Sequence, residues 1–164
     1  MLQCGQLFLY GIHGVCQIVD VEVRVIDRKK IEYYVLEPVS HPSARFYVPV
    51  HNQVALSKLH PLLSKEELCA LISSCDANRD SWIPDEGQRK NRYRELINGS
   101  DRAALLAMVR SVWVQKDLQL TSGKKFHQCD ENFLRDAQKV LGSELSLVLG
   151  IAFDKVFEYI QNNT

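Results

Sequence analysis

The stretch LSKEELCALISS, at residues 63–74, marks the change from strand patterning to helix patterning along the chain. Ser64 followed by Glu67 forms a capping box, in which the serine hydroxyl accepts from the Glu67 amide and the Glu67 carboxylate accepts from the Ser64 amide. The sequence therefore predicts a helix that begins after Ser64 and runs to about Ser74. Strand signals precede this point and helix signals follow it, which indicates an α+β protein.

The N-terminal part is predicted to form a small, strongly bent barrel of about five strands. Valines alternate with charged residues over 19–24, which is the period of a sheet with one solvent-facing side. After a polar turn at 27–30, segments rich in β-branched and aromatic residues follow at 31–36 and 45–50. Pro49 cannot donate an amide hydrogen bond, so we expect its strand at a sheet edge or a bulge.

The C-terminal part is predicted to form an all-α bundle of about five helices. After the first of them comes a turn-rich joint, NRDSWIPDEG at 78–87, in which proline and glycine discourage a continued helix. Caps and apolar periodicity indicate further helices at about 88–98, after Ser100 or Asp101, at 133–149 and at 153–160. We divide the chain accordingly into a β module, residues 1–60, and a helical module, residues 61–164.

Composition argues against several classes of protein. Of the 164 residues, 46% are hydrophobic and 24% are charged, the balance of a soluble globular protein. The N-terminus lacks the charged start and cleavage site of a signal peptide, so we expect a cytoplasmic protein with no membrane contact. Five cysteines without CxxC spacing are typical of reduced thiols and supply no familiar set of four metal ligands. We therefore expect no metal, no cofactor and no small-molecule substrate.

The motifs of common catalytic sites are missing from the sequence. It contains no Walker-type phosphate loop, no GxSxG elbow and no HExxH motif. The GIHG sequence at 11–14 predicts a tight turn between two strands, and His13 has no nucleophile or carboxylate nearby in sequence. Asp130 and Glu131 lie at a predicted helix start, where the helix dipole accounts for them. An enzyme is the class that the sequence supports least, and we expect no catalytic residues.

Charge is unevenly distributed, although 20 Lys and Arg balance 20 Asp and Glu. Residues 89–125 carry 9 basic against 3 acidic side chains, whereas residues 64–88 carry 2 against 6. A local excess of this size is typical of a surface that meets a polyanion. The candidate DNA-binding cations in this region are Arg89, Lys90, Arg92, Arg94, Lys124 and Lys125. A solvated helix face is the alternative, and the sequence leaves both open.

Trp82 also has two interpretations. A lone tryptophan is commonly a core or interface anchor. Its place in an exposed joint, near the four cations that begin at Arg89, instead suits an apolar wedge that inserts at a base step while the cations contact phosphates. Trp113 differs, because it lies on the apolar stripe of its predicted helix, and we assign it to the core.

Several motifs together resemble a known family. The pattern GQLFLYGIHGVCQIVDVE, IEYYVLEP and FYVPVHN, followed by RYRELINGSDRAALLAMVRSVW and AQKVLGSEL, resembles the CarD/CdnL group of bacterial transcription regulators. The resemblance covers nearly the whole chain. The first part also resembles the RNA-polymerase-interacting module of the transcription-repair coupling factor, whose ATP-binding motif is not found here.

The resemblance implies a fold, two partners and a set of contact residues. A Tudor- or SH3-like barrel would bind the β subunit of RNA polymerase, with Arg24, Arg45 and Tyr47 facing it. The helical module would touch promoter DNA at the upstream edge of the transcription bubble without reading its sequence. Trp82 would wedge into the minor groove there and alter the stability of the open complex.

Three departures from the family pattern bear on these expectations. Tyr47 falls where many members carry arginine. The IPDE segment after Trp82 adds about one helical turn relative to shorter members, and Asp130 and Glu131 replace a lysine that lies near DNA in some members, so we expect Lys124 and Lys125 to contact phosphates instead. The alternative to a DNA-contacting regulator is an adaptor that binds polymerase or another protein only. A thiol or metal-site enzyme is a third hypothesis.

Overall fold

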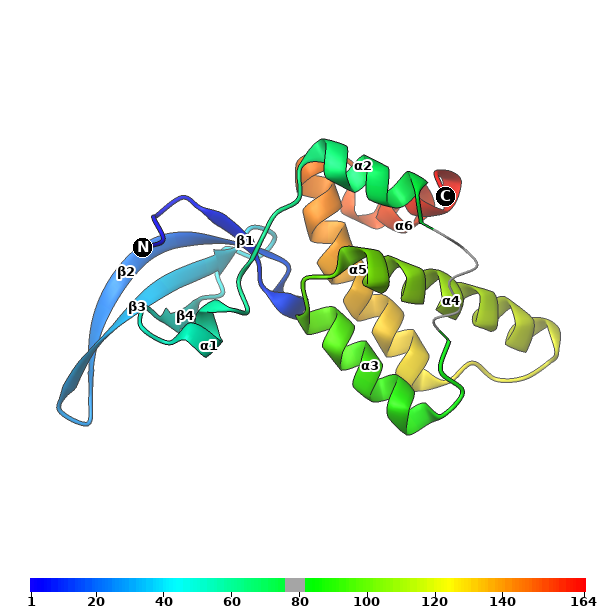
Figure 1. Cartoon of the computed structure of the whole chain (residues 1–164), viewed down its shortest axis with the longest axis horizontal. Helices are drawn as coiled ribbons and strands as arrows, with labels where there is room; N and C mark the ends of the chain where they lie inside the picture. The colour runs from blue at the N-terminus through cyan, green and yellow to red at the C-terminus, as the bar shows by residue number, and fades with distance from the viewer. Residues whose placement is uncertain (76–81) are drawn as a thin grey trace.

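The computed structural model describes residues 1–75 and 82–164, in which a curled sheet lies beside a helical bundle (Figure 1). Among the described residues, five antiparallel strands form this sheet, in the order β4-β3-β2-β1-β5. Their bounds are β1 (Leu7–Leu9), β2 (Val15–Ile26), β3 (Lys29–Pro38), β4 (Phe46–Pro49) and β5 (His60–Pro61), with η1 (Gly11–His13) and α1 (Gln53–Leu56) between them. The predicted α+β class and the small bent module of about five strands are confirmed, as a half-barrel. Pro49 lies in an edge strand, as expected from its missing amide.

The β2–β3 hairpin extends away from the bundle (Figure 1). Its turn is formed by Asp27 and Arg28, both with positive φ, as a tight two-residue hairpin connection requires. The alternating valines do form a strand, but their apolar face is not covered in the outer half of the hairpin. Val21, Val23 and Val25 are 43%, 56% and 67% exposed, because this ribbon runs past the sheet's core.

In the part of the chain that the structure describes, the bundle consists of five α-helices and one 3-10 turn. Their bounds are α2 (Lys65–Ser73), α3 (Glu86–Asn98), α4 (Arg102–Thr121), α5 (Gln128–Leu149), η2 (Phe153–Lys155) and α6 (Val156–Asn162). The capping box at Ser64 is present, with both of its hydrogen bonds, and Asp101 caps α4. Within residues 1–75 and 82–164, no helix has the length and hydropathy needed to cross a membrane. The NRDS part of the predicted joint, at 78–81, lies outside the described residues.

Two apolar clusters stabilise the two modules. The sheet encloses a small core of Cys16, Ile18, Tyr34, Leu36, Val48, Val50 and Leu59. The larger core is made by side chains of α2 to α6, and Leu9 of β1 and Val15 of β2 belong to it. The inner end of the sheet is therefore packed into the bundle. The division of the chain at residue 60 stays a prediction.

The turn η1 fixes the sheet against the C-terminal half of α5. Gly14, which follows the turn, has φ +71° and ψ −150°, a conformation open essentially to glycine alone. A Cβ there would lie 2.7 Å from Ser143 Oγ, so glycine is also needed for the close approach to α5. The amide of the next residue, Val15, donates to Ser143 Oγ at 3.1 Å. The predicted tight turn at 11–14 is thus confirmed, and it forms a contact between the modules.

A buried ion pair fixes the linker between the modules. Arg102 and Glu144 are 5% and 0% exposed, and their side chains form two hydrogen bonds of 3.0 Å. Arg102 also donates to the Pro61 carbonyl at 2.9 Å, and Glu144 accepts from the Leu63 amide at 2.9 Å. The linker that leaves β5 is therefore bonded on both sides of Leu62 to one charge pair of α4 and α5.

Replacing Gly14 by alanine tests the contact between the modules. Gly14→Ala adds backbone strain and a clash with Ser143, so we expect it to lower the free energy of unfolding by roughly 2 kcal/mol or more. Gly150→Ala is the matched control, because Gly150 has φ +70° but no described heavy atom within 4 Å of its added Cβ, and it is expected to cost about 1 kcal/mol. Urea unfolding measures both values, and equal losses would contradict a tight η1–α5 contact.

Candidate functional site

Trp82 lies just before α3 at the surface of the bundle. Its side chain is partly buried and packs against the helical core. The Arg89 guanidinium carbon lies 4.3 Å from the centroid of the indole ring, a cation–π contact. The indole therefore contacts the core with part of its surface and leaves the rest exposed to solvent.

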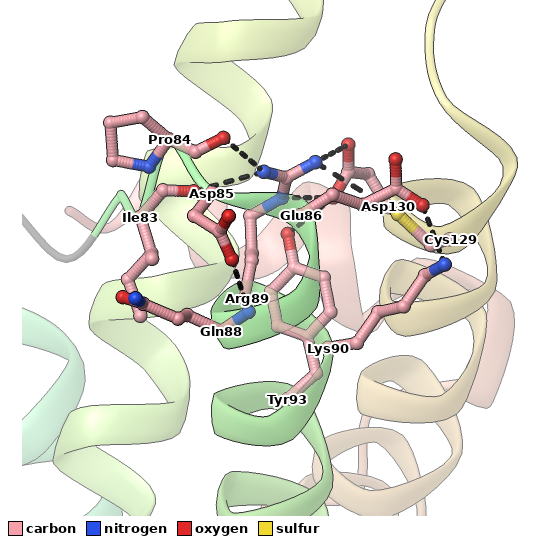
Figure 2. A network of polar contacts seen from close by, with 10 residues as sticks. All are labelled: Ile83, Pro84, Asp85, Glu86, Gln88, Arg89, Lys90, Tyr93, Cys129 and Asp130. Carbon is pink, nitrogen blue, oxygen red and sulfur yellow. Dashed lines mark hydrogen bonds and ion pairs between the residues drawn. The ribbon is translucent and has the colours of Figure 1, made fainter.

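Arg89 lies at the centre of a polar network that connects residues 83–84, just before α3, to α3 itself and to α5 (Figure 2). Its Nε and Nη2 donate to the two carboxylate oxygens of Asp130 at 2.8 and 3.2 Å, which is a bidentate ion pair. Its Nη1 donates to the carbonyls of Ile83 and Pro84 at 2.9 and 3.1 Å. The segment that follows Trp82 is therefore held by its backbone to a side chain of α3.

The acceptor of this network, Asp130, is 0% exposed and lies in the first turn of α5. Tyr93 donates its hydroxyl to Asp130 at 2.6 Å, and its ring stacks on Phe133 with centroids 4.0 Å apart. Burial is the largest single influence on the pKa of Arg89 and acts to lower it, but the hydrogen bonds and the negative charge of Asp130 together raise the pKa above its ordinary value. Burial and the hydrogen bond to Asp130 raise the pKa of Tyr93. Both donors therefore keep their protons near neutral pH.

The prediction that Arg89 contacts DNA is wrong. The residue is 2% exposed, and its nitrogens donate to partners within the protein. A buried guanidinium is stable only when it is paired and hydrogen-bonded, and leaving this site would strand Asp130 as an unpaired buried charge.

The other three cations of α3 do not form one surface. Lys90 pairs with Glu86, one turn earlier, and Arg92 pairs with Glu95 at 3.2 Å. At about 100° per residue, Lys90 and Arg94 share a flank of the helix and Arg92 lies on the opposite flank. Lys90 and Arg94 line a groove of about 350 Å³ between α3 and α5. The predicted cluster of four cations is therefore divided between the interior and two flanks.

Lys124 and Lys125 lie in the exposed loop between α4 and α5. Neither makes an ion pair within 4.0 Å to a residue of 1–75 or 82–164, unlike Lys90 and Arg92. Of the predicted phosphate contacts, these two lysines are therefore among the least engaged with acidic side chains in the described part of the chain.

The three residues expected to face polymerase are brought together on one surface of the sheet. The Arg24 guanidinium carbon, on β2, lies 3.7 Å from the ring centroid of Tyr47 on β4. Arg45, directly before β4, pairs with Glu37 at 3.0 Å and approaches Glu22 at 4.0 Å, and Glu22 also pairs with Arg24. We call Arg24, Arg45, Tyr47, Glu22 and Glu37 the arginine–tyrosine surface.

The comparison with known families decides the nature of the sheet module. Residues 2–60 match the family model described as the CarD-like/TRCF RID domain. This segment is a CarD-like/TRCF RID domain. A search of curated proteins found no match to the chain. The domain implies a transcription-related protein that interacts with the β subunit of RNA polymerase.

The match confirms the family resemblance for the RID domain. The arginine–tyrosine surface lies within the matched residues, whereas Trp82 and the helical module follow them. The individual polymerase contacts of Arg24, Arg45 and Tyr47 stay predictions, as do all the DNA contacts of the helical module.

Sequence reasoning missed the partners of Arg89. The helix dipole alone accounts for Asp130 at the level of sequence, and nothing local links this residue to an arginine 41 residues away. One signal was present: Arg89 shares the i, i+4, i+7, i+8 spacing of Tyr93, Leu96 and Ile97, all of them buried. An arginine on an apolar stripe indicates a buried, paired side chain rather than a surface cation.

The cysteines and other potential ligands do not gather into a metal site in the described part of the chain. No group of three or more His, Cys, Asp or Glu that could hold a metal ion occurs there. Cys16 is fully buried in the sheet core, and burial raises the pKa of its thiol to about 12. Cys4 and Cys69 are exposed, whereas Cys16 serves as a small apolar side chain in the core of the sheet.

Removing the charge of Asp130 tests the network around Arg89. Asp130→Asn keeps the shape of the side chain but leaves a buried guanidinium uncompensated, so we expect a loss of about 3–5 kcal/mol in the free energy of unfolding. Lys90→Met, which breaks the exposed pair with Glu86, is the control and is expected to change stability little. Urea unfolding with circular dichroism measures both, and a small loss for Asp130→Asn would contradict a buried ion pair.

Proposed function

We propose that this protein is a CarD-like transcription regulator whose RID domain binds the polymerase β subunit while its helical module contacts promoter DNA at the upstream edge of the bubble. In this role Trp82 inserts at the minor groove and changes the stability of the open complex, without base-specific readout. The role requires no catalytic step and no cofactor. The protein acts where the polymerase acts, in the bacterial cytoplasm.

The observation that carries the proposal is the position of Trp82. A partly exposed indole, held at the surface of the bundle by Arg89, lies in a chain whose other module is a polymerase-binding domain. A wedge needs a flat apolar side chain that is partly exposed to solvent on one side and packed against the protein on the other. Both conditions hold for Trp82.

The electrostatic part of the proposed contact is small. With Arg89 buried and two α3 cations paired to glutamates, Arg94, Lys124 and Lys125 support roughly three phosphate contacts, so log K would fall by about 2.7 per log unit of salt. DNA binding of this strength depends on tethering, because attachment to polymerase raises the local DNA concentration to about the millimolar range.

A second function, a polymerase-binding adaptor without DNA contact, is favoured by the same charge pattern. Lys90 and Arg92 are neutralised by acidic neighbours within hydrogen-bonding distance, which weakens attraction to a polyanion. The helical module would then bind another protein.

Trp82→Ala separates the two functions. Under the first, the variant binds polymerase normally but shortens the lifetime of the polymerase–promoter open complex by about fivefold or more, since a lost wedge contact of about 1 kcal/mol has that effect. Competitor-challenge decay of open complexes measures the lifetime, and co-purification measures polymerase binding. Trp113→Phe, at the contact with Phe157, is the control and is expected to leave the lifetime unchanged. An unchanged lifetime for Trp82→Ala with intact binding would support the adaptor.

Charge reversal on the arginine–tyrosine surface tests the polymerase contact. Arg24→Glu and Arg45→Glu place like charges beside Glu22 and Glu37 and remove cations from the surface, so we expect each to weaken binding to the β subunit by about tenfold or more. Lys58→Glu makes the same charge change elsewhere on the RID domain, beside Tyr10 and Asn98, and serves as the control. Equal effects of the three variants would mean that polymerase binds a different surface.

A further inference from the structure

We infer that Arg89, anchored by Asp130, is a positioning residue that determines how the Trp82 indole is presented at the surface. The inference rests on the proposed function where it concerns promoter DNA. Its structural part, the control of the indole by the clamp of Arg89, Asp130 and Tyr93, can be tested in the free protein.

The guanidinium of Arg89 can hold the backbone and the indole at the same time. A guanidinium is planar, donates hydrogen bonds in its plane, and offers its face to an aromatic ring. Here the in-plane donors bond to Asp130 and to the carbonyls of Ile83 and Pro84, and the guanidinium carbon lies 4.3 Å from the Trp82 ring centroid. One side chain thus fixes both the ring and the two residues that follow it.

The clamp is itself held by two helices. Arg89 and Tyr93 come from α3 and Asp130 from the first turn of α5, where the helix dipole favours its negative charge. The Tyr93 hydroxyl occupies the Asp130 oxygen that also accepts from Arg89 Nε, and Tyr93 is fixed in turn by its stack on Phe133. The position of the guanidinium is therefore set by helix packing, and the segment at 82–85 follows it.

A second buried ion pair in the protein makes it possible to distinguish a specific effect on the indole from a general loss of stability. Arg102 and Glu144 have the same chemistry and similar burial as Arg89 and Asp130. Their further hydrogen bonds go to Pro61, Leu63 and Ser100, and not to the segment at 82–85. Weakening this pair disturbs the fold comparably but gives no direct change at the indole.

Arginine-to-lysine variants at the two sites use this difference. Lysine keeps the positive charge and a hydrogen bond to the carboxylate. Unlike the planar guanidinium, however, it cannot bond to both carbonyls and stack on the indole at the same time. In a Trp113→Phe background Trp82 is the single tryptophan, because the chain has two. Acrylamide quenching and anisotropy decay of Trp82 then report its exposure and mobility, and circular dichroism confirms folding.

We expect Arg89→Lys to raise the quenching constant of Trp82 by about twofold and to speed its local motion, because the stack and the backbone anchors are lost. Arg102→Lys is expected to leave both unchanged. Equal quenching in folded Arg89→Lys and its parent, or equal increases in the two lysine variants, would overturn the inference. If Arg89→Lys does not fold, Tyr93→Phe, which removes only the hydroxyl bond to Asp130, is expected to give a smaller increase, and no increase would overturn it.

A double-mutant cycle connects the clamp to the polymerase–promoter complex. We expect Arg89→Lys to shorten the open-complex lifetime, and to have no further effect when Trp82 is already alanine, because the arginine acts through the indole. A lifetime loss that persists without Trp82 would overturn the positioning role. If quenching changes as expected while Trp82→Ala leaves the lifetime unaltered, the proposed DNA contact fails and the clamp itself stands.

Discussion

Helix α5 carries two buried carboxylates, one near each end, and each is paired with an arginine from another helix. Glu144, through Arg102, holds the linker that leaves the RID domain. Asp130, through Arg89, holds the segment that follows Trp82. At 1.5 Å per residue the two carboxylates lie about 20 Å apart along the helix axis. The helix therefore acts as a strut that sets the spacing between the polymerase-binding module and the indole.

Buried ion pairs suit such a role better than apolar contacts do. Their net contribution to stability is small, because desolvation offsets the attraction, but an arrangement that breaks a pair leaves a bare charge in the interior. The pairs on α5 therefore penalise other positions of the linker and of the joint. Gly14 adds a steric restriction at the same helix, since its approach to Ser143 leaves no room for a side chain. The geometry that relates the modules is thus fixed by contacts with few alternatives.

The features that the sequence predicted well have local causes. The capping box at Ser64, the edge position of Pro49 and the turn at 11–14 each depend on the chemistry of a few neighbouring residues. The family resemblance places both Arg24 and Tyr47 on the side of the sheet that faces polymerase. The structure brings their side chains into contact although β3 lies between their strands, β2 and β4. Arg89 was mistaken for a surface cation because its partner lies on another helix, far along the chain. The exposure of the hairpin valines was not predictable for a similar reason. Alternation predicts a strand, but tertiary packing decides whether the apolar face of that strand is covered.

The most direct measurement of the central claim is site-specific photocrosslinking from position 82 of the full chain, assembled with RNA polymerase on a promoter. If the strut places residue 82 at the DNA, a photoreactive phenylalanine analogue there crosslinks to the upstream edge of the bubble, and only when polymerase is present. The same analogue at position 113, where Trp113 packs against Phe157, gives no DNA crosslink. Crosslinks from position 82 to protein alone, in a complex whose RID domain is bound, would contradict the account.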